Sequence, residues 1–179
     1  PPPSRRGLVL IDPAYEDKDD YRKVRLAIEE SQKRFATGTY AVWYPALGRL
    51  EAQQLPERLK RCAASDWLHV SLSIGSYAEG QGLHSSGMFI INPPWTLKAA
   101  LEQAMPWLAN VLGHGSGSYV LQSGTAARVK KERDEWFLPG QLGYWAMHFY
   151  SPYFLAQYFL LAMILNTPIS TGKQAEICF

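Results

Sequence analysis

Short apolar runs alternate with amphipathic stretches through the first two thirds of the chain. Residues 7–11 form the most continuous apolar run and stop at an acidic residue and a proline, as a buried strand does where it meets a loop. Apolar side chains then recur at helical spacing over 21–35, after an N-cap that we place at Asp19 or Asp20. The aromatic and branched run 39–44 predicts a second strand.

The alternation continues to about residue 122. Residues 49–64 predict another helix, with Pro56 as the first-turn residue of a restart. Thr96 caps a helix that ends near Gly113, and further strands are predicted over 69–74, 88–92 and 118–122. This order of elements predicts an α/β layered fold with a mostly parallel sheet, whose ligands would collect at the carboxyl ends of its strands.

Charge and cysteine content exclude several classes of protein. The 179 residues carry 18 basic and 16 acidic side chains, so a polyanion would have to meet a local basic patch. Cys62 and Cys178 form neither a CxxC pair nor a disulfide framework, and the four histidines match no metal-ligand spacing. We therefore expect no metal site and a reducing, cytoplasmic compartment.

The composition changes near Trp136, beyond which the only charged residues are Lys173 and Glu176. Residues 144–165 carry no formal charge, and a segment of that length would span a bilayer. Three origins fit it: a membrane anchor, an apolar segment that packs on the sheet, or the product of a frameshift or mistaken gene boundary. We favour the last and expect no membrane attachment. We therefore divide the chain into a first domain over 1–125 and an apolar tail over 126–179.

Two similar tetrads follow predicted strands: Asp12-Pro13-Ala14-Tyr15 and Asn92-Pro93-Pro94-Trp95. A methyltransferase that acts on an exocyclic amino group needs this set of residue types. The amino nitrogen of adenine is a poor nucleophile, because its lone pair is delocalised into the ring. A carboxylate and a backbone carbonyl that accept hydrogen bonds from its N–H groups aim the lone pair at the methyl donor, while the aromatic ring stacks on the extruded base.

The plainer interpretation is that each tetrad begins a turn at the end of a strand. The first tetrad is the stronger catalytic candidate, because the strand before it is the most continuously apolar, as a central strand would be. Asp12 also ionises, whereas Asn92 takes no proton.

Three separated segments, residues 5–16, 33–45 and 86–95, resemble the bacterial 23S rRNA adenine-N6 methyltransferase family RlmJ, and Pro106-Trp107-Leu108 continues the likeness. The likeness covers about residues 1–123 and corresponds to the C-terminal half of that enzyme. It implies a partial Rossmann-like, class I S-adenosylmethionine-dependent methyltransferase fold, with a mostly parallel sheet and a late antiparallel strand.

The resemblance also implies a reaction and a site. The reaction is N6-methylation of one adenine in 23S rRNA, free or partly assembled, with S-adenosylmethionine as the methyl donor. In the family, the acidic residue of the tetrad accepts the proton and contacts the methyl donor, which assigns both roles to Asp12. Pro13, Ala14 and Tyr15 would then face the substrate.

The chain departs from the family in two respects. A second proline of the family is Ala14 here, which loosens the loop by about 0.4–1 kcal/mol. The glycine-rich donor loop, the acidic ribose contact and the N-terminal RNA-contacting segment have no counterpart. We therefore expect an N-terminally truncated fragment that is inactive by itself, with an unpaired apolar edge on its first strand.

Two alternatives stay open: a DNA adenine-N6 methyltransferase, and a non-catalytic nucleic-acid-binding or membrane-attached module. Arg5, Arg6, Lys33 and Arg34 are candidates for contacts to RNA phosphates. Lys33 and Arg34 also suit a helix C-terminus, where positive charge is favoured, and we prefer that interpretation.

Overall fold

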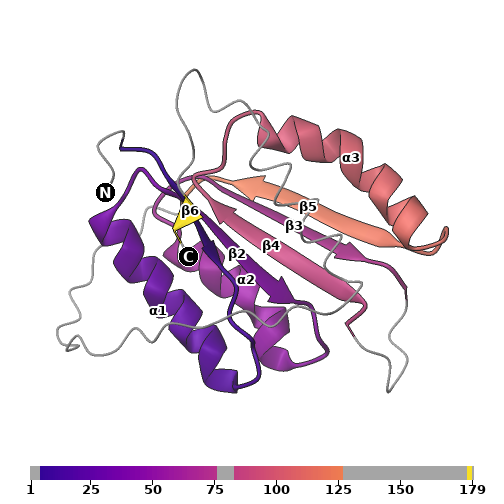
Figure 1. Ribbon diagram of the computed structural model, residues 1–179, viewed down its shortest axis with the longest axis horizontal. Helices are drawn as coiled ribbons and strands as arrows, with labels where there is room; N and C mark the ends of the chain where they lie inside the picture. Colours follow the sequence, from indigo (N-terminus) through magenta and orange to yellow (C-terminus); the bar gives the residue numbers. More distant parts are fainter. Residues whose placement is uncertain (1–4, 76–82, 127–176, 179) are drawn as a thin grey trace.

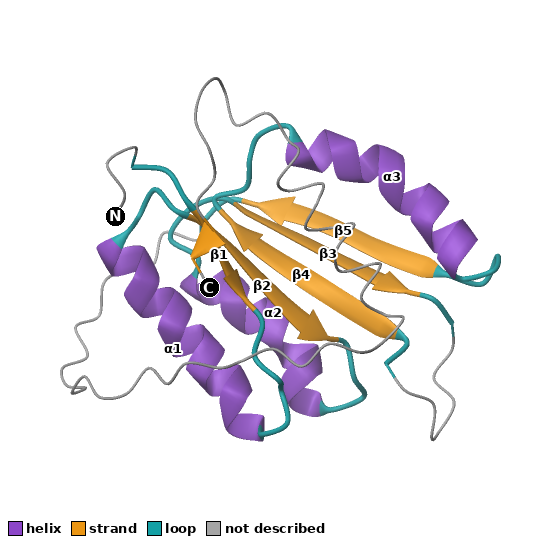
Figure 2. Ribbon diagram, in the orientation of Figure 1, coloured by secondary structure: helices purple, strands orange, loops and turns teal. Residues whose placement is uncertain are grey.

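The computed structural model describes residues 5–75, 83–126 and 177–178. The elements in chain order are β1 (Leu8–Ile11), α1 (Lys18–Arg34), β2 (Thr39–Pro45), α2 (Leu50–Cys62), β3 (Trp67–Ser73), β4 (Ser85–Ile91), α3 (Leu97–Leu112), β5 (Ser118–Gly124) and β6 (Ile177–Cys178). Helices α1 and α2 cover one face of the sheet and α3 covers the other (Figures 1 and 2). The predicted α/β layered fold is confirmed.

The sheet is not mostly parallel, and that part of the prediction is wrong. Its strand order is β5-β3-β4-β2-β1-β6. Strand β1 pairs in parallel with β2 and β6, whereas the pairs β2–β4, β3–β4 and β3–β5 are antiparallel. The reason is that β4 inserts between β2 and β3, which point the same way, and itself runs in the opposite direction. The expected late antiparallel strand is present as β5.

Alternation along the strands sends side chains to two separate cores. In β2, Tyr40, Val42 and Tyr44 face α1 and α2, whereas Ala41 faces α3. The helices face these strand side chains with apolar residues that recur at helical spacing. Those that α3 buries are Leu97, Leu101, Met105, Leu108 and Ala109.

Two local details differ from the sequence prediction. The N-cap of α1 is Asp17, whose carboxylate accepts a hydrogen bond from the Asp19 N–H at 2.9 Å, so Asp19 and Asp20 lie in the first turn. Helix α2 runs through Pro56 without a restart. Pro56 has no backbone N–H, so the helical hydrogen bond that another residue would donate from this position is missing, and its ring is buried.

The capping prediction for α3 is correct in position only. Thr96 is the N-cap residue, but its side chain makes no capping hydrogen bond. Its backbone is already in the right-handed helical region, and its buried hydroxyl has no hydrogen-bond partner among the described residues.

The outer edge of β1 is partly covered instead of fully unpaired. Leu8 and Val9 lie in parallel register with Ile177 and Cys178 of β6. All four residues of β1 are half-buried, in contrast to the largely buried β2.

No helix within the described residues is long and apolar enough to cross a bilayer. The uncharged stretch 144–165 lies outside those residues, as does most of the proposed tail 126–179.

Candidate functional site

Asp12 is the first residue beyond the carboxyl end of β1. Ile11 lies in register with Val42 of β2, so Asp12 emerges from the sheet beside Trp43. Asp12 is an exposed residue, Pro13 is half-buried and Ala14 is exposed. The structure therefore places Asp12 at the surface, at the end of the sheet where the parallel strands β1 and β2 stop.

Tyr15 is buried, with 2% of its surface exposed. Its ring centre lies 4.8 Å from that of Tyr21 and 6.4 Å from that of Trp43, and its hydroxyl donates a hydrogen bond to the Trp43 carbonyl at 2.6 Å. Burial, together with the nearby Asp12 carboxylate, holds the Tyr15 pKa well above its ordinary value, so the phenol stays a donor. In this conformation no ring face is open to a base, contrary to the expected stacking role, and the side chain instead anchors the loop to β2.

The backbone at Tyr15 adopts the left-handed conformation, with φ of 55°. Such a conformation costs a bulky residue about 1–3 kcal/mol and persists only where surrounding contacts enforce it. The buried ring and its hydroxyl bond supply such contacts. The carbonyls of Tyr15 and Glu16 also accept hydrogen bonds from Nη1 of Arg49, at 3.4 and 3.5 Å.

Arg49 had no role in the sequence analysis. It is the N-cap residue of α2 and follows β2 closely. A cation just past the carboxyl end of the neighbouring parallel strand is the sequence signal that would have found it.

The second tetrad lies at the opposite end of the strands from Asp12. Strand β4 runs antiparallel to β2 with Ile91 opposite Tyr40, which puts Asn92 beside the start of β2. There the Asn92 side-chain amide donates to the Thr37 carbonyl at 3.1 Å, and the Thr39 hydroxyl donates to the Asn92 carbonyl at 2.9 Å. The two tetrads do not form one site, and the contacts of Asn92 fit the turn interpretation.

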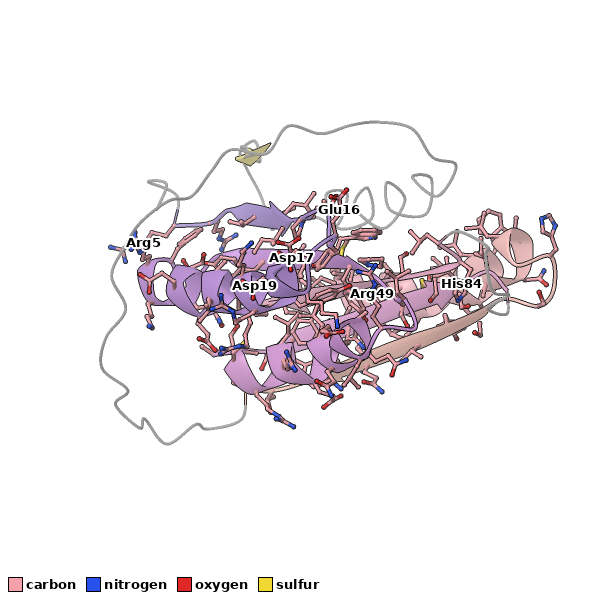
Figure 3. The ribbon with its side chains drawn as sticks, turned by 90° about the horizontal axis from the view of Figure 1, so that it is seen from below. Arg5, Glu16, Asp17, Asp19, Arg49 and His84 are labelled. Atoms are coloured by element: carbon pink, nitrogen blue, oxygen red, sulfur yellow. The ribbon has the colours of Figure 1, made fainter. Side chains whose placement is uncertain are left out.

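Basic residues singled out in the sequence also lie away from Asp12. Arg5 lies before β1, at the end of the strand opposite to Glu16 and Arg49 (Figure 3). Lys33 and Arg34 lie in the last turn of α1 and pair with Glu30, at 3.6 and 2.8 Å. These contacts support the helix-terminus interpretation for this pair.

Acidic side chains dominate the loop that follows Asp12. Exposed Glu16 and Asp17 precede α1, Asp19 and Asp20 open it, and the first turn of α2 adds Glu51. The cations among them are Lys18, which pairs with Glu51 at 3.6 Å, and Arg49; Arg22 and Lys23, one turn further along α1, pair with Asp19 and Asp20 at 3.2 and 3.3 Å. Figure 3 shows Glu16, Asp17 and Arg49 in this region. The described residues here are poorly suited to bind RNA phosphates.

The site fits S-adenosylmethionine only in part. The exposed Asp12 carboxylate suits a hydrogen bond from the amino group of such a donor. Residues 12–17, which join β1 to α1, contain no glycine, so this turn lacks the close backbone approach of a glycine-rich donor loop. Within the described residues, no group of three His, Cys, Asp or Glu side chains is arranged to hold a metal ion.

The fold and this loop define the class of protein: an α/β domain with an accessible carboxylate and a proline at the carboxyl end of a parallel strand, where such folds place their ligands. The chain belongs to the family described as ribosomal RNA large subunit methyltransferase D, RlmJ, whose model matches residues 1–124. The resemblance seen in the sequence is thereby confirmed.

Similar proteins include two named ribosomal RNA large subunit methyltransferase J. The one from Haemophilus influenzae is 45% identical over 123 residues, which are 68% of this chain and 44% of that protein. The one from Escherichia coli K12 is 40% identical over 126 residues, 68% of this chain and 45% of that protein. The crystal structure of protein LPL1258 from Legionella pneumophila matches with a TM-score of 0.63 and 32% identity, over 69% of this chain and 46% of that one. The chain thus spans less than half the length of these relatives.

Proposed function

We propose that this chain is the catalytic-loop part of an S-adenosylmethionine-dependent methyltransferase that modifies adenine N6 in 23S rRNA. Membership of the RlmJ family supports the reaction class. The observation that carries the proposal is the exposed position of Asp12 directly after β1. A reaction on ribosomal RNA places the protein in the cytoplasm.

Asp12 and Pro13 would act on the amino group of adenine. The Asp12 carboxylate accepts a hydrogen bond from one N–H, and the Pro13 carbonyl accepts one from the other, which turns the nitrogen lone pair out of the ring plane. S-adenosylmethionine supplies the electrophilic methyl group. As the new N–C bond forms, the bond between the methyl carbon and the sulfonium sulfur would break and leave the neutral sulfur of S-adenosylhomocysteine; the nitrogen would become cationic, and Asp12 would take its surplus proton directly or through water.

Tyr15 has a positioning role in this proposal. Its buried ring and its hydroxyl bond to the Trp43 carbonyl hold the end of the loop against β2. Ala14 lies exposed between Pro13 and this anchor, so the loop has one rigid proline and one freer residue. We assign no base-stacking residue within the loop.

The remaining contacts to the methyl donor and to RNA belong to the part of the family that this chain does not match. Acidic residues around Asp12 favour this assignment of the RNA contacts to the unmatched part, because RNA phosphates need cations nearby. The chain by itself is then inactive, and the half-buried β1 is the strand that the other part would complete.

The test is a joined protein in which the unmatched part of the Haemophilus influenzae relative precedes this chain. We expect methyl transfer to 23S rRNA that lacks the modification, and a fall of about 10²–10⁴-fold for Asp12→Asn, which keeps the shape of the side chain and removes its charge. Equal activity of Asp12→Asn would refute the catalytic role. Transfer to duplex DNA but not to rRNA would favour the DNA enzyme, and inactivity on both substrates would favour a non-catalytic module.

A further inference from the structure

Within the described part of the chain, the side chain of Arg49 reaches from the end of the loop after β2 to the loop that carries Asp12. Nη1 of Arg49 lies 3.4 Å from the Tyr15 carbonyl and 3.5 Å from the Glu16 carbonyl. These bonds are long, but the donor is charged and one nitrogen serves two consecutive carbonyls. The first of the two accepting carbonyls lies three residues after Asp12, and both belong to the main chain.

The backbone conformation at Tyr15 is one that surrounding contacts must stabilise, and Arg49 adds to those of the ring. A φ of 55° is unfavourable for a tyrosine, and the ring fixes only the side-chain end of this residue. Because Arg49 binds the carbonyl of Tyr15 and the next one, it fixes the main chain on the far side of the turn. The buried ring and the guanidinium therefore hold the same turn from two directions.

The main chain at and before Arg49 is itself held in place by backbone hydrogen bonds. The Arg49 carbonyl accepts a hydrogen bond from the Gln53 N–H at 3.2 Å in the first turn of α2. The chain just after β2 is tied to the start of β4, because the Ala46 N–H donates to the Ser85 carbonyl at 2.9 Å.

The surroundings of Arg49 disfavour a role in RNA binding. Its guanidinium already binds two carbonyls, Glu16 and Asp17 are exposed in the same loop, and the nearby Lys18 is paired with Glu51 at 3.6 Å, so these cations are already engaged. Arg49 is exposed, so its loss opens no cavity in the core. What its loss removes is the pair of hydrogen bonds to the Tyr15 and Glu16 carbonyls.

We propose that Arg49 is a positioning residue for methyl transfer, which acts by holding the turn at Tyr15 and Glu16 so that Asp12 and the Pro13 carbonyl keep their directions. The inference rests on the proposed catalytic role of Asp12. It predicts an effect on the rate of the chemical step and not on substrate affinity, because Arg49 would act through the loop.

The test compares Arg49→Ala and Arg49→Lys with a matched control, Arg58→Ala. Arg58 lies on α2, and among the described residues its guanidinium bonds to Gln54 one turn earlier, at 2.6 Å, and not to the loop after β1. The first measurement is amide hydrogen exchange of residues 12–17 in the full chain. We expect exchange to be roughly tenfold faster in Arg49→Ala, as for the loss of one charge-assisted hydrogen bond, with a smaller change in Arg49→Lys and none in Arg58→Ala.

The second measurement is methyl transfer by the joined protein. We expect Arg49→Ala to lower kcat by about 10–100-fold at an unchanged KM, with partial recovery in Arg49→Lys. Unchanged exchange over 12–17 would overturn the inference whatever the activity, and so would a raised KM at unchanged kcat. If the joined protein with Arg49 intact transfers no methyl group, the proposed function fails, and the exchange data alone then decide whether Arg49 holds the loop.

Discussion

The hydroxyl of Tyr15 donates a hydrogen bond of 2.6 Å to the backbone carbonyl of Trp43. This bond joins the loop after β1 to the neighbouring strand β2, across 28 residues of sequence. It helps to explain why an aromatic residue expected to face the substrate is instead buried, with 2% of its surface exposed.

Tyr15→Phe removes this hydroxyl and keeps the ring. The Trp43 carbonyl then loses its donor in a part-buried setting, and we expect the free energy of unfolding to fall by about 1–2 kcal/mol. Urea denaturation measures the change. Tyr119→Phe, at a residue on β5 that is 40% exposed, is the matched control and should change stability little. Equal effects of the two variants would contradict the anchoring role.

Ala14→Pro restores the second proline of the family. The residue is exposed, and a proline there reduces the freedom of the unfolded chain. We expect the free energy of unfolding to rise by about 0.4–1 kcal/mol and the kcat of the joined protein to increase. A loss of stability in urea denaturation would show that the backbone at Ala14 is incompatible with proline.

Gly87→Ala forces a methyl group against the Tyr44 ring. A Cβ built at Gly87 lies 2.3 Å from Tyr44 Cζ, whereas one built at Gly48 meets no atom within 4 Å. Overpacking of this kind costs about 1–3 kcal/mol, and we expect that loss for Gly87→Ala in urea denaturation. Gly48→Ala is the control, and a loss of similar size there would remove the steric explanation.

Acidification should destabilise the protein through His69, which is 7% exposed and lies with Nε2 2.7 Å from the Tyr44 hydroxyl. Burial lowers the pKa of His69 to about 4; Lys60 adds to the shift and Glu57 opposes it. The unfolded chain, with an ordinary histidine pKa of 6.5, takes up the proton first as the pH falls, so stability present above pH 6.5 is lost between 6.5 and about 4.

For this group alone, the free energy of unfolding at pH 5 should be about 2 kcal/mol lower than at pH 7. Urea titrations of the native chain and of His69→Gln at both pH values measure the difference. Identical pH dependence in the two proteins would exclude His69 as its source.

The chain alone should show no measurable binding of S-adenosylmethionine by calorimetry. The loop after β1 provides one carboxylate and no glycine, so most contacts to such a donor are expected from the unmatched part of the family. The joined protein is the positive control. Micromolar affinity of the chain by itself would mean that the donor site is complete within it.

Much of the local structure was predictable from the sequence. The run at 7–11 and the periodic residues of α1 and α3 placed these elements within a few residues, because helical and strand periodicity depend on neighbours along the chain. The cap of α1 was misplaced by two or three residues, since several acidic residues compete for that position. The exposed place of Asp12 at the end of β1 was also as expected.

Other features depend on contacts between distant segments. Strand β4 runs antiparallel to β2 and β3, so Asn92 lies at the opposite end of the strands from Asp12, although each tetrad directly follows a strand. The burial of Tyr15 depends on its contacts with Tyr21 and Trp43, and the contact from Arg49 depends on the turn at Tyr15.

The sequence by itself determined the helices, most of the strands, the family and the carboxylate at the end of β1, because local periodicity and residue identity carry that information. Only the tertiary structure decided the direction of neighbouring strands, the inward turn of Tyr15 and the contact from Arg49. These depend on which strands pair, and that choice is made by packing between segments that are far apart in the chain.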